Sequence, residues 1–103
     1  MYKIEYLPVA RQDMVETVNY ISRELQNPVA AERLAIKMIE AIDGLVTFPY
    51  VNPLHYPIRP LEQEYRKLFI QNYIVFYWID EEKKTIIIAR VIYARRDLEK
   101  AIQ

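Results

Sequence analysis

Three apolar runs separated by short polar stretches dominate the last third of the chain. The first run alternates aliphatic or aromatic residues with cations, the second is aromatic and β-branched, and the third is the most apolar stretch of the sequence. They comprise residues 65–70, 73–79 and 85–93. The polar pair Gln71-Asn72 has the length of a tight hairpin loop, in which Asn tolerates a positive φ, and residues 80–83 form a charged turn. The pattern predicts three consecutive antiparallel strands, a β-meander.

The N-terminal half predicts a short strand followed by two helices. Residues 2–7 alternate apolar and polar side chains, and Pro8 suits the first turn of a helix. Apolar residues then recur at spacings of four and three, as on one face of a helix: Ala10, Met14, Val18, Ile21 and Leu25. Asn27-Pro28 combines a preferred N-cap with a preferred first helical residue, so one helix ends and another begins there.

The second helix carries an apolar stripe that we expect to pack against the sheet. The stripe consists of Ala31, Leu34, Ala35, Met38, Ala41, Ile42, Leu45 and Phe48. Gly44, the only glycine, lies inside it at a cost of about 1 kcal/mol relative to Ala. The helix is expected to end near Pro49 and to form an antiparallel hairpin with the first. Residues 49–64 hold four of the six prolines and therefore form a stiff, extended loop.

These elements define an α+β fold with the order β-α-α-β-β-β and a short C-terminal helix or tail over residues 95–103. The helical hairpin is expected to pack on one face of a mainly antiparallel sheet. With 103 residues, 52% of them hydrophobic, we expect residues 1–103 to form a single domain.

The composition removes several classes of site. There is no cysteine and one histidine, His55, which excludes thiolate and multi-histidine metal sites, and we expect neither metal nor cofactor. No apolar run approaches the length of about 20 residues that a membrane span requires, and the N-terminus lacks the pattern of a signal peptide. We therefore expect a cytoplasmic protein without membrane contact.

The charge is zero in total but unevenly distributed. The segment before Pro57 is acidic, whereas the segment from Arg59 onward is basic. A basic sheet end of this kind suits nucleic acid or an acidic partner.

Together, these motifs resemble the RelE/ParE superfamily of type II toxin–antitoxin toxins over nearly the whole chain. The resemblance rests on the order and spacing of Ala10 and Asp13, Asn27-Pro28 with Ala31, Leu45 with Phe48-Pro49, Tyr65-Arg66, residues 72–77 and residues 90–97. It implies a growth inhibitor that a cognate antitoxin holds inactive in a heterocomplex. It also implies one of two targets, because RelE-like members cleave mRNA on the ribosome whereas ParE-like members poison DNA gyrase.

Part of the RelE-like catalytic set is matched in this sequence. Arg66 and Lys67 match the basic stretch of the second strand, and Arg95-Arg96 match the arginine-bearing segment after the last strand. Tyr93 stands where many relatives carry histidine. A RelE-like enzyme would be a metal-independent endoribonuclease that uses Arg66, Lys67, Tyr93, Arg95 and Arg96 as its catalytic residues.

Other positions depart from the RelE pattern. Ile70 and Ile102 occupy the places of a second catalytic arginine and of the tyrosine that stacks on the RNA base. Gln71 and Ala94 replace glycines that are common in the family. The resemblance therefore favours the ParE-like mechanism, with the RelE-like endoribonuclease as the alternative. A degenerate toxin retained for antitoxin binding and autoregulation is the second alternative.

Several remaining residues have structural interpretations that we expect to prevail. Arg90 lies inside an apolar strand and needs a carboxylate partner, so we predict an ion pair. We expect His55 to lie on the surface without a chemical role, and the acidic turn Asp80-Glu81-Glu82 to be solvated. Four aromatic residues could stack on bases but are more often core on a sheet covered by helices: Tyr65, Tyr73, Tyr77 and Trp78. Adjacent strand residues such as Arg66 and Lys67 should point to opposite faces.

The expected antitoxin contact follows from these surfaces. We predict an amphipathic antitoxin segment that carries Asp or Glu. It should contact the sheet end near Arg95-Arg96 and the groove beside the helical hairpin.

Overall fold

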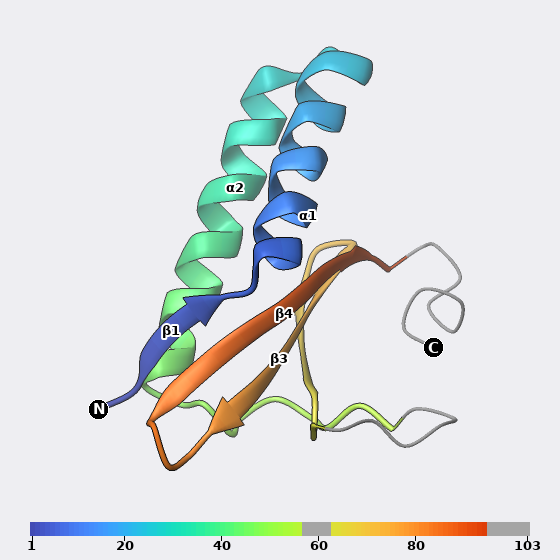
Figure 1. Ribbon diagram of the computed structural model, residues 1–103. Coiled ribbons are helices and arrows are strands. Elements are labelled where there is room, and N and C mark those ends of the chain that lie inside the picture. The colour runs from blue at the N-terminus through green and yellow to red at the C-terminus, as the bar shows by residue number, and fades with distance from the viewer. Residues whose placement is uncertain (57–62, 95–103) are drawn as a thin grey trace.

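A four-stranded sheet and a helical hairpin form the molecule. The computed structural model describes residues 1–56 and 63–94. In chain order the elements are β1 (Lys3–Tyr6), α1 (Pro8–Asn19), a π-helical turn (Tyr20–Glu24), α2 (Pro28–Asp43), a 3₁₀ turn (Gly44–Val46), β2 (Arg66–Ile70), β3 (Tyr73–Asp80) and β4 (Thr85–Tyr93). Both helices lie on one side of the sheet (Figure 1). The predicted α+β architecture is confirmed, while the tail predicted for residues 95–103 lies outside the described residues.

The sheet has the strand order β1-β4-β3-β2. The three C-terminal strands pair antiparallel in sequence order, which confirms the predicted β-meander. β1 joins the sheet beside β4 in the parallel direction. The longest and most apolar strand, β4, is therefore central and carries the N-terminal strand on one side.

The two-residue loop between β2 and β3 has its positive φ at a different residue from the one predicted. Gln71 adopts a φ of 53°, so the left-handed position is the first residue of the pair and not Asn72. The Asn72 carbonyl instead accepts a hydrogen bond from the Ala94 backbone N–H at 2.6 Å. The hairpin length was predicted correctly because it depends only on where the strands stop.

The end of the first helix differs from the single α-helix predicted to run to Leu25. The α-helical pattern ends at Asn19 and continues as the π-helical turn, after which Gln26 adopts a φ of 49°. The second helix begins as predicted, since the Asn27 side chain accepts a hydrogen bond from the Ala30 backbone N–H at 3.1 Å.

The apolar stripe of α2 packs against the sheet as predicted, except at its C-terminal end. Its buried members are Ala31, Leu34, Met38 and Ile42, followed by Leu45 in the 3₁₀ turn. Gly44 lies at the helix end with an ordinary helical φ of −62°, not in the helix interior. Phe48 is 66% exposed, so its predicted place on the packed face is wrong. The helical periodicity no longer applies there, because α2 ends at Asp43.

Both faces of the sheet carry apolar clusters. The larger cluster lies beneath the helices and contains Ala10, Leu34, Met38, Ile42, Leu45, Ile70, Val75, Tyr77, Ile86, Ile88 and Val91. The smaller one, on the opposite face, contains Ile74, Phe76 and Ile92, with Tyr65 and Ala94 packed against it. The prediction that Tyr77 belongs to the core is confirmed. Within the described residues, no helix has the length and apolar character to cross a membrane.

Residues 49–56 return the chain to the sheet, as the prolines predicted. The His55 backbone N–H donates to the Tyr65 carbonyl at 2.7 Å, and the Lys67 N–H donates to the Pro53 carbonyl at 3.0 Å. The buried Tyr77 hydroxyl donates to the Pro49 carbonyl at 3.1 Å and accepts from the Asn52 side chain at 3.1 Å. The loop is therefore joined to both the edge of β2 and the core.

The first prediction compares two apolar residues on opposite faces of α2. Met38 is 1% exposed, so Met38→Ala should lower the free energy of unfolding by about 2–5 kcal/mol. Ile36 is 49% exposed, and Ile36→Ala should change it by about 0.5 kcal/mol or less. Urea unfolding of the two variants measures the difference, and equal losses would contradict the described packing.

Candidate functional site

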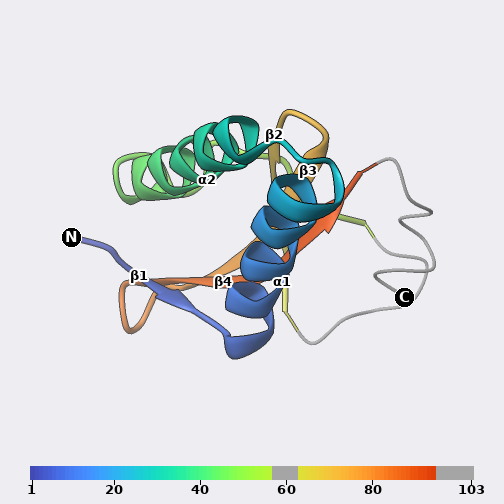
Figure 2. The same cartoon turned by 90° about the horizontal axis from the view of Figure 1, so that it is seen from above.

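The carboxylate of Asp13 joins the helical hairpin to the central strand. α1 crosses over β4 when the molecule is viewed from above (Figure 2). Asp13 Oδ2 accepts hydrogen bonds from Arg90 Nε at 2.8 Å and from the Val91 backbone N–H at 2.9 Å, while Oδ1 accepts from Arg90 Nη2 at 3.2 Å. The ion pair predicted for Arg90 is confirmed. We call this arrangement the Asp13 clamp.

A β-bulge places the Asp13 clamp. Phe76 pairs with Arg90 but Tyr77 pairs with Ile88, so Ala89 is an additional residue on β4. The pairing of β1 with β4 also stops at Ile88. Beyond that point the outer edge of β4 faces α1, and Asp13 accepts the Val91 N–H that points to this edge. The additional residue shifts the alternation along the strand by one, so that Val91 joins Ile86 and Ile88 in the cluster beneath the helices and its backbone N–H meets Asp13.

A groove of about 800 Å³ opens beside the Asp13 clamp. Its walls come from α1, the π-helical turn, the start of α2, the β2–β3 loop and the end of β4. The lining residues are Asp13, Glu16, Thr17, Tyr20, Ile21, Leu25, Asn27, Ala30, Leu34, Gln71, Asn72, Tyr73, Arg90, Val91, Ile92 and Tyr93. The lining combines a few charged groups with apolar side chains.

The groove has an apolar floor and an exposed apolar rim. Leu34, Val91 and Ile92 are buried, whereas Tyr20 and Leu25 are 54% and 56% exposed. The π-helical turn contributes Tyr20 to this rim, and segments of this kind are frequent at functional sites. At the sheet end of the groove, the rings of Tyr73 and Tyr93 lie 5.2 Å apart.

The structure places Arg66 and Lys67 on opposite faces of β2, as predicted. Arg66 lies opposite Tyr77 and Lys67 lies opposite Phe76, and these two residues of β3 belong to different apolar clusters. The Arg66 guanidinium donates to the Asn52 carbonyl at 2.7 Å and to the Tyr50 carbonyl at 3.3 Å, and it stacks 5.0 Å from the centre of the Tyr50 ring. Arg66 therefore holds the loop against the sheet.

His55 is not on the surface as predicted. Its imidazole is half-buried and packs edge-on against Phe76, with ring centres 5.2 Å apart. Burial, and to a smaller extent the charge of Lys67, lowers the pKa of His55. His55 Nε2 is buried and has no hydrogen-bond partner within residues 1–56 and 63–94. Loop closure against β2 buries this ring, a long-range contact that local sequence did not reveal.

Among the described residues, the predicted catalytic set does not converge on one point. Arg66 is engaged with the loop, Lys67 lies on the face of the smaller cluster, and Tyr93 lines the groove near the helices. Arg95 and Arg96 lie outside the described residues. The described part of the chain also contains no group of three His, Asp or Glu side chains arranged to hold a metal ion.

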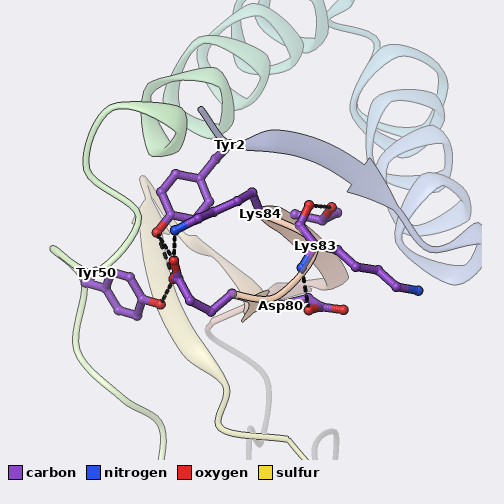
Figure 3. Close-up of polar contacts among 7 residues, drawn as sticks. Tyr2, Tyr50, Asp80, Lys83 and Lys84 are labelled. Atoms are coloured by element: carbon purple, nitrogen blue, oxygen red, sulfur yellow. Dashed lines mark hydrogen bonds and ion pairs between the residues drawn. The ribbon is translucent and has the colours of Figure 1, made fainter.

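The structure contains a second polar cluster, centred on Glu81 in the turn before β4. It was not predicted from the sequence, because Glu81 was expected only to be solvated. The Glu81 carboxylate accepts hydrogen bonds from the hydroxyls of Tyr2 and Tyr50 and pairs with the Lys84 ammonium (Figure 3). It thereby joins the N-terminal segment, the loop and the β3–β4 turn. The side chains come from distant parts of the sequence, so the spacing of residues gave no signal of the cluster.

The class of protein follows from a family match over nearly the whole chain: the protein is a toxin of a type II toxin–antitoxin system in the RelE/ParE superfamily. The family model described as the ParE toxin of the type II toxin–antitoxin system parDE matches residues 4–98. The chain therefore belongs to the ParE toxin family. Comparison with curated proteins gave no match.

Solved structures with the same fold include members of both branches of the superfamily. One is a protein chain from the chromosomal ParDE toxin–antitoxin system of P. aeruginosa, with a TM-score of 0.72 and 14% sequence identity. The alignment covers 92% of this chain and 98% of that chain. For a chain of the toxin–antitoxin complex RelBE2 of Mycobacterium tuberculosis, the TM-score is 0.63 at 22% sequence identity. The alignment covers 89% of this chain and 96% of that chain. For the isolated E. coli RelE toxin, the TM-score is 0.57 at 17% sequence identity. The alignment covers 99% of this chain and 96% of that chain. These similarities confirm the fold.

The second prediction concerns the pH dependence of the Glu81 cluster. Hydrogen bonding to Lys84, and then to Tyr50 and Tyr2, lowers the pKa of Glu81 from 4.5 to about 2. Because the folded-state pKa lies below the unfolded value, the stabilisation is present above pH 4.5 and is lost as the pH falls toward 2. Glu81→Gln should therefore lower the melting temperature at pH 7. The difference in melting temperature between this variant and the wild type should shrink as the pH falls from 4.5 toward 2.

Glu82→Gln, in the same exposed turn, is the matched control and should leave the melting curve nearly unchanged at both ends of the range. Thermal denaturation followed by circular dichroism measures the three proteins. A deficit of Glu81→Gln that is as large at pH 2 as at pH 7 would contradict the proposed cause.

Proposed function

We propose that the protein is a ParE-like toxin that inhibits DNA gyrase in the cytoplasm and is neutralised by a cognate antitoxin. The match of the ParE family model to residues 4–98 supports this target. The toxin would act by binding, without catalysing a reaction itself.

The observation that carries the proposal is the engagement of Arg66, the one arginine of the predicted catalytic set that lies within the described residues. RelE-like cleavage requires cations that converge on the phosphate where negative charge develops. Here the guanidinium of Arg66 donates hydrogen bonds to the backbone carbonyls of Tyr50 and Asn52 and is thereby held against the loop. The position of a further catalytic arginine is taken by Ile70, which is buried and cannot donate a hydrogen bond. This arrangement favours a scaffold for binding.

A ribosome-dependent endoribonuclease is the second candidate, supported by one specific observation. Burial, and in smaller part the charge of Lys67, lowers the pKa of the half-buried His55 imidazole, which favours the neutral form that can accept a proton. Lys67 could then stabilise a phosphorane, with Arg95, Arg96 and Tyr93 as further groups. This candidate would use His55 as the general base.

The third prediction separates the two candidates. Purified toxin added to DNA gyrase and relaxed plasmid should inhibit supercoiling and lead to accumulation of cleaved, protein-linked DNA. Induced expression should arrest growth with filamentation, while primer extension on a reporter transcript shows intact mRNA. The Arg95→Ala/Arg96→Ala variant should lose toxicity but keep the wild-type unfolding transition.

The opposite result is equally defined. Breaks between bases of the ribosomal A-site codon within minutes of induction, abolished by Arg96→Ala, with gyrase unaffected, would establish the endoribonuclease instead.

A further inference from the structure

We infer that the groove beside the Asp13 clamp receives a helix of the antitoxin that is apolar on one side and presents a lysine or arginine to Glu16. The inference rests on the proposed antitoxin partner and specifies the chemistry of the segment that it inserts. It revises, for the groove, the expectation of a segment carrying Asp or Glu that would contact both this groove and the sheet end near Arg95-Arg96.

The charge of the groove is the first argument. Its described lining contains two carboxylates, Asp13 and Glu16, and one guanidinium, Arg90. The Asp13 carboxylate is already engaged by Arg90 and by the Val91 N–H. The groove therefore retains one negative charge that no cation among the described residues neutralises through an ion pair, and it is located on Glu16.

Glu16 is available to a partner's cation. Its carboxylate accepts a hydrogen bond from the neutral amide of Gln12, Nε2 to Oε1, at 2.9 Å, and the residue is exposed. The pKa of Arg90 is raised chiefly by its hydrogen bonding to Asp13 and in smaller part by the charge of Glu16, so the field of Glu16 extends into the groove. A segment that placed a carboxylate here would be repelled, whereas a lysine or arginine would be attracted.

The hydrogen bonding of β4 is the second argument, because it disfavours the addition of a strand. Val91 points its backbone N–H away from β3, toward the edge that an added strand would use. Asp13 already accepts that N–H at 2.9 Å, so pairing there would have to break the clamp. A helix needs no backbone hydrogen bonds from its partner and binds through side chains spaced at i, i+3, i+4 and i+7.

The apolar surface is the third argument. The rim residues Tyr20 and Leu25 are more than half exposed, and Leu34 and Val91 form a buried floor between them and the sheet. The apolar side of an incoming helix would cover this rim while its cation reached Glu16. A second copy of this chain is the competing occupant, since the exposed face of α2 also combines an apolar residue, Ile36, with a cation, Lys37.

The fourth prediction tests charge and shape with matched variants. The probe is the small protein encoded by the adjacent reading frame, titrated calorimetrically into the full-length toxin at fixed salt concentration. Glu16→Lys and Leu25→Ser should each weaken binding about tenfold or more. Glu40→Lys and Ile36→Ser, exposed on α2 away from the groove, should stay within about twofold of the wild type.

Two further measurements establish the partner's chemistry. Replacing the contacting lysine or arginine of the antitoxin with glutamate should restore binding to Glu16→Lys, and circular dichroism should show a gain of helix in the complex over the sum of its components. Unchanged binding of both groove variants to a partner that binds the wild type would overturn the inference alone. A toxin dimer that Glu16→Lys dissociates would overturn it in favour of a second copy. Failure of the wild type to bind the probe at all would overturn the antitoxin partner and with it the inference.

Discussion

The hydrogen bonds accepted by the Asp13 carboxylate determine how the helical hairpin and the sheet meet. Asp13 and Arg90 are separated by 77 positions, yet one carboxylate holds both the Arg90 side chain and the backbone of the next residue. Hydrogen bonds to a charged acceptor contribute about 1.5–3 kcal/mol, and a buried donor without a partner has a comparable cost. The point where β1 leaves β4 is thereby stabilised without another strand.

The two ends of β4 consequently differ in their surroundings. At its start, Glu81 joins the N-terminal segment, the loop and a turn, and Arg66 and Tyr77 hold the same loop against the sheet. At its end, the Asp13 clamp satisfies the backbone while the groove beside it remains open. The first end positions the scaffold, and the second offers apolar surface and a negative charge to a partner. This division agrees with the proposed binding of an antitoxin at the groove.

The sequence predicted the features that depend on neighbouring residues. The bounds of β4 coincide with the predicted run, and Asn27 caps α2 because a cap needs only a side-chain oxygen three residues before an N–H. The sequence predicted that Arg90 pairs with a carboxylate but not that this carboxylate is Asp13, because no local pattern relates the two residues. The β-bulge at Ala89 could not be predicted because residues 85–89 of the strand are buried, so apolar alternation gave no register.

The predicted site residues illustrate the same limit. Adjacent positions placed Arg66 and Lys67 on opposite faces, but the contact of Arg66 with Tyr50 and Asn52 depends on how the loop folds back. Predicting the groove would also have required the conformation at the end of the first helix. There a π-helical turn replaces the expected regular α-helix, and Tyr20 in this turn is exposed. Such features arise from packing between distant segments.

A double-mutant cycle between Asp13 and Arg90 tests most directly the claim that this contact joins the helical hairpin to the sheet. The free energy of unfolding in urea would be measured for the wild type, Asp13→Ala, Arg90→Ala and the double variant. We predict a favourable coupling energy of about 1–3 kcal/mol, as expected for residues that share hydrogen bonds across a partly buried contact. Single-variant effects that add to within about 0.3 kcal/mol would contradict the account.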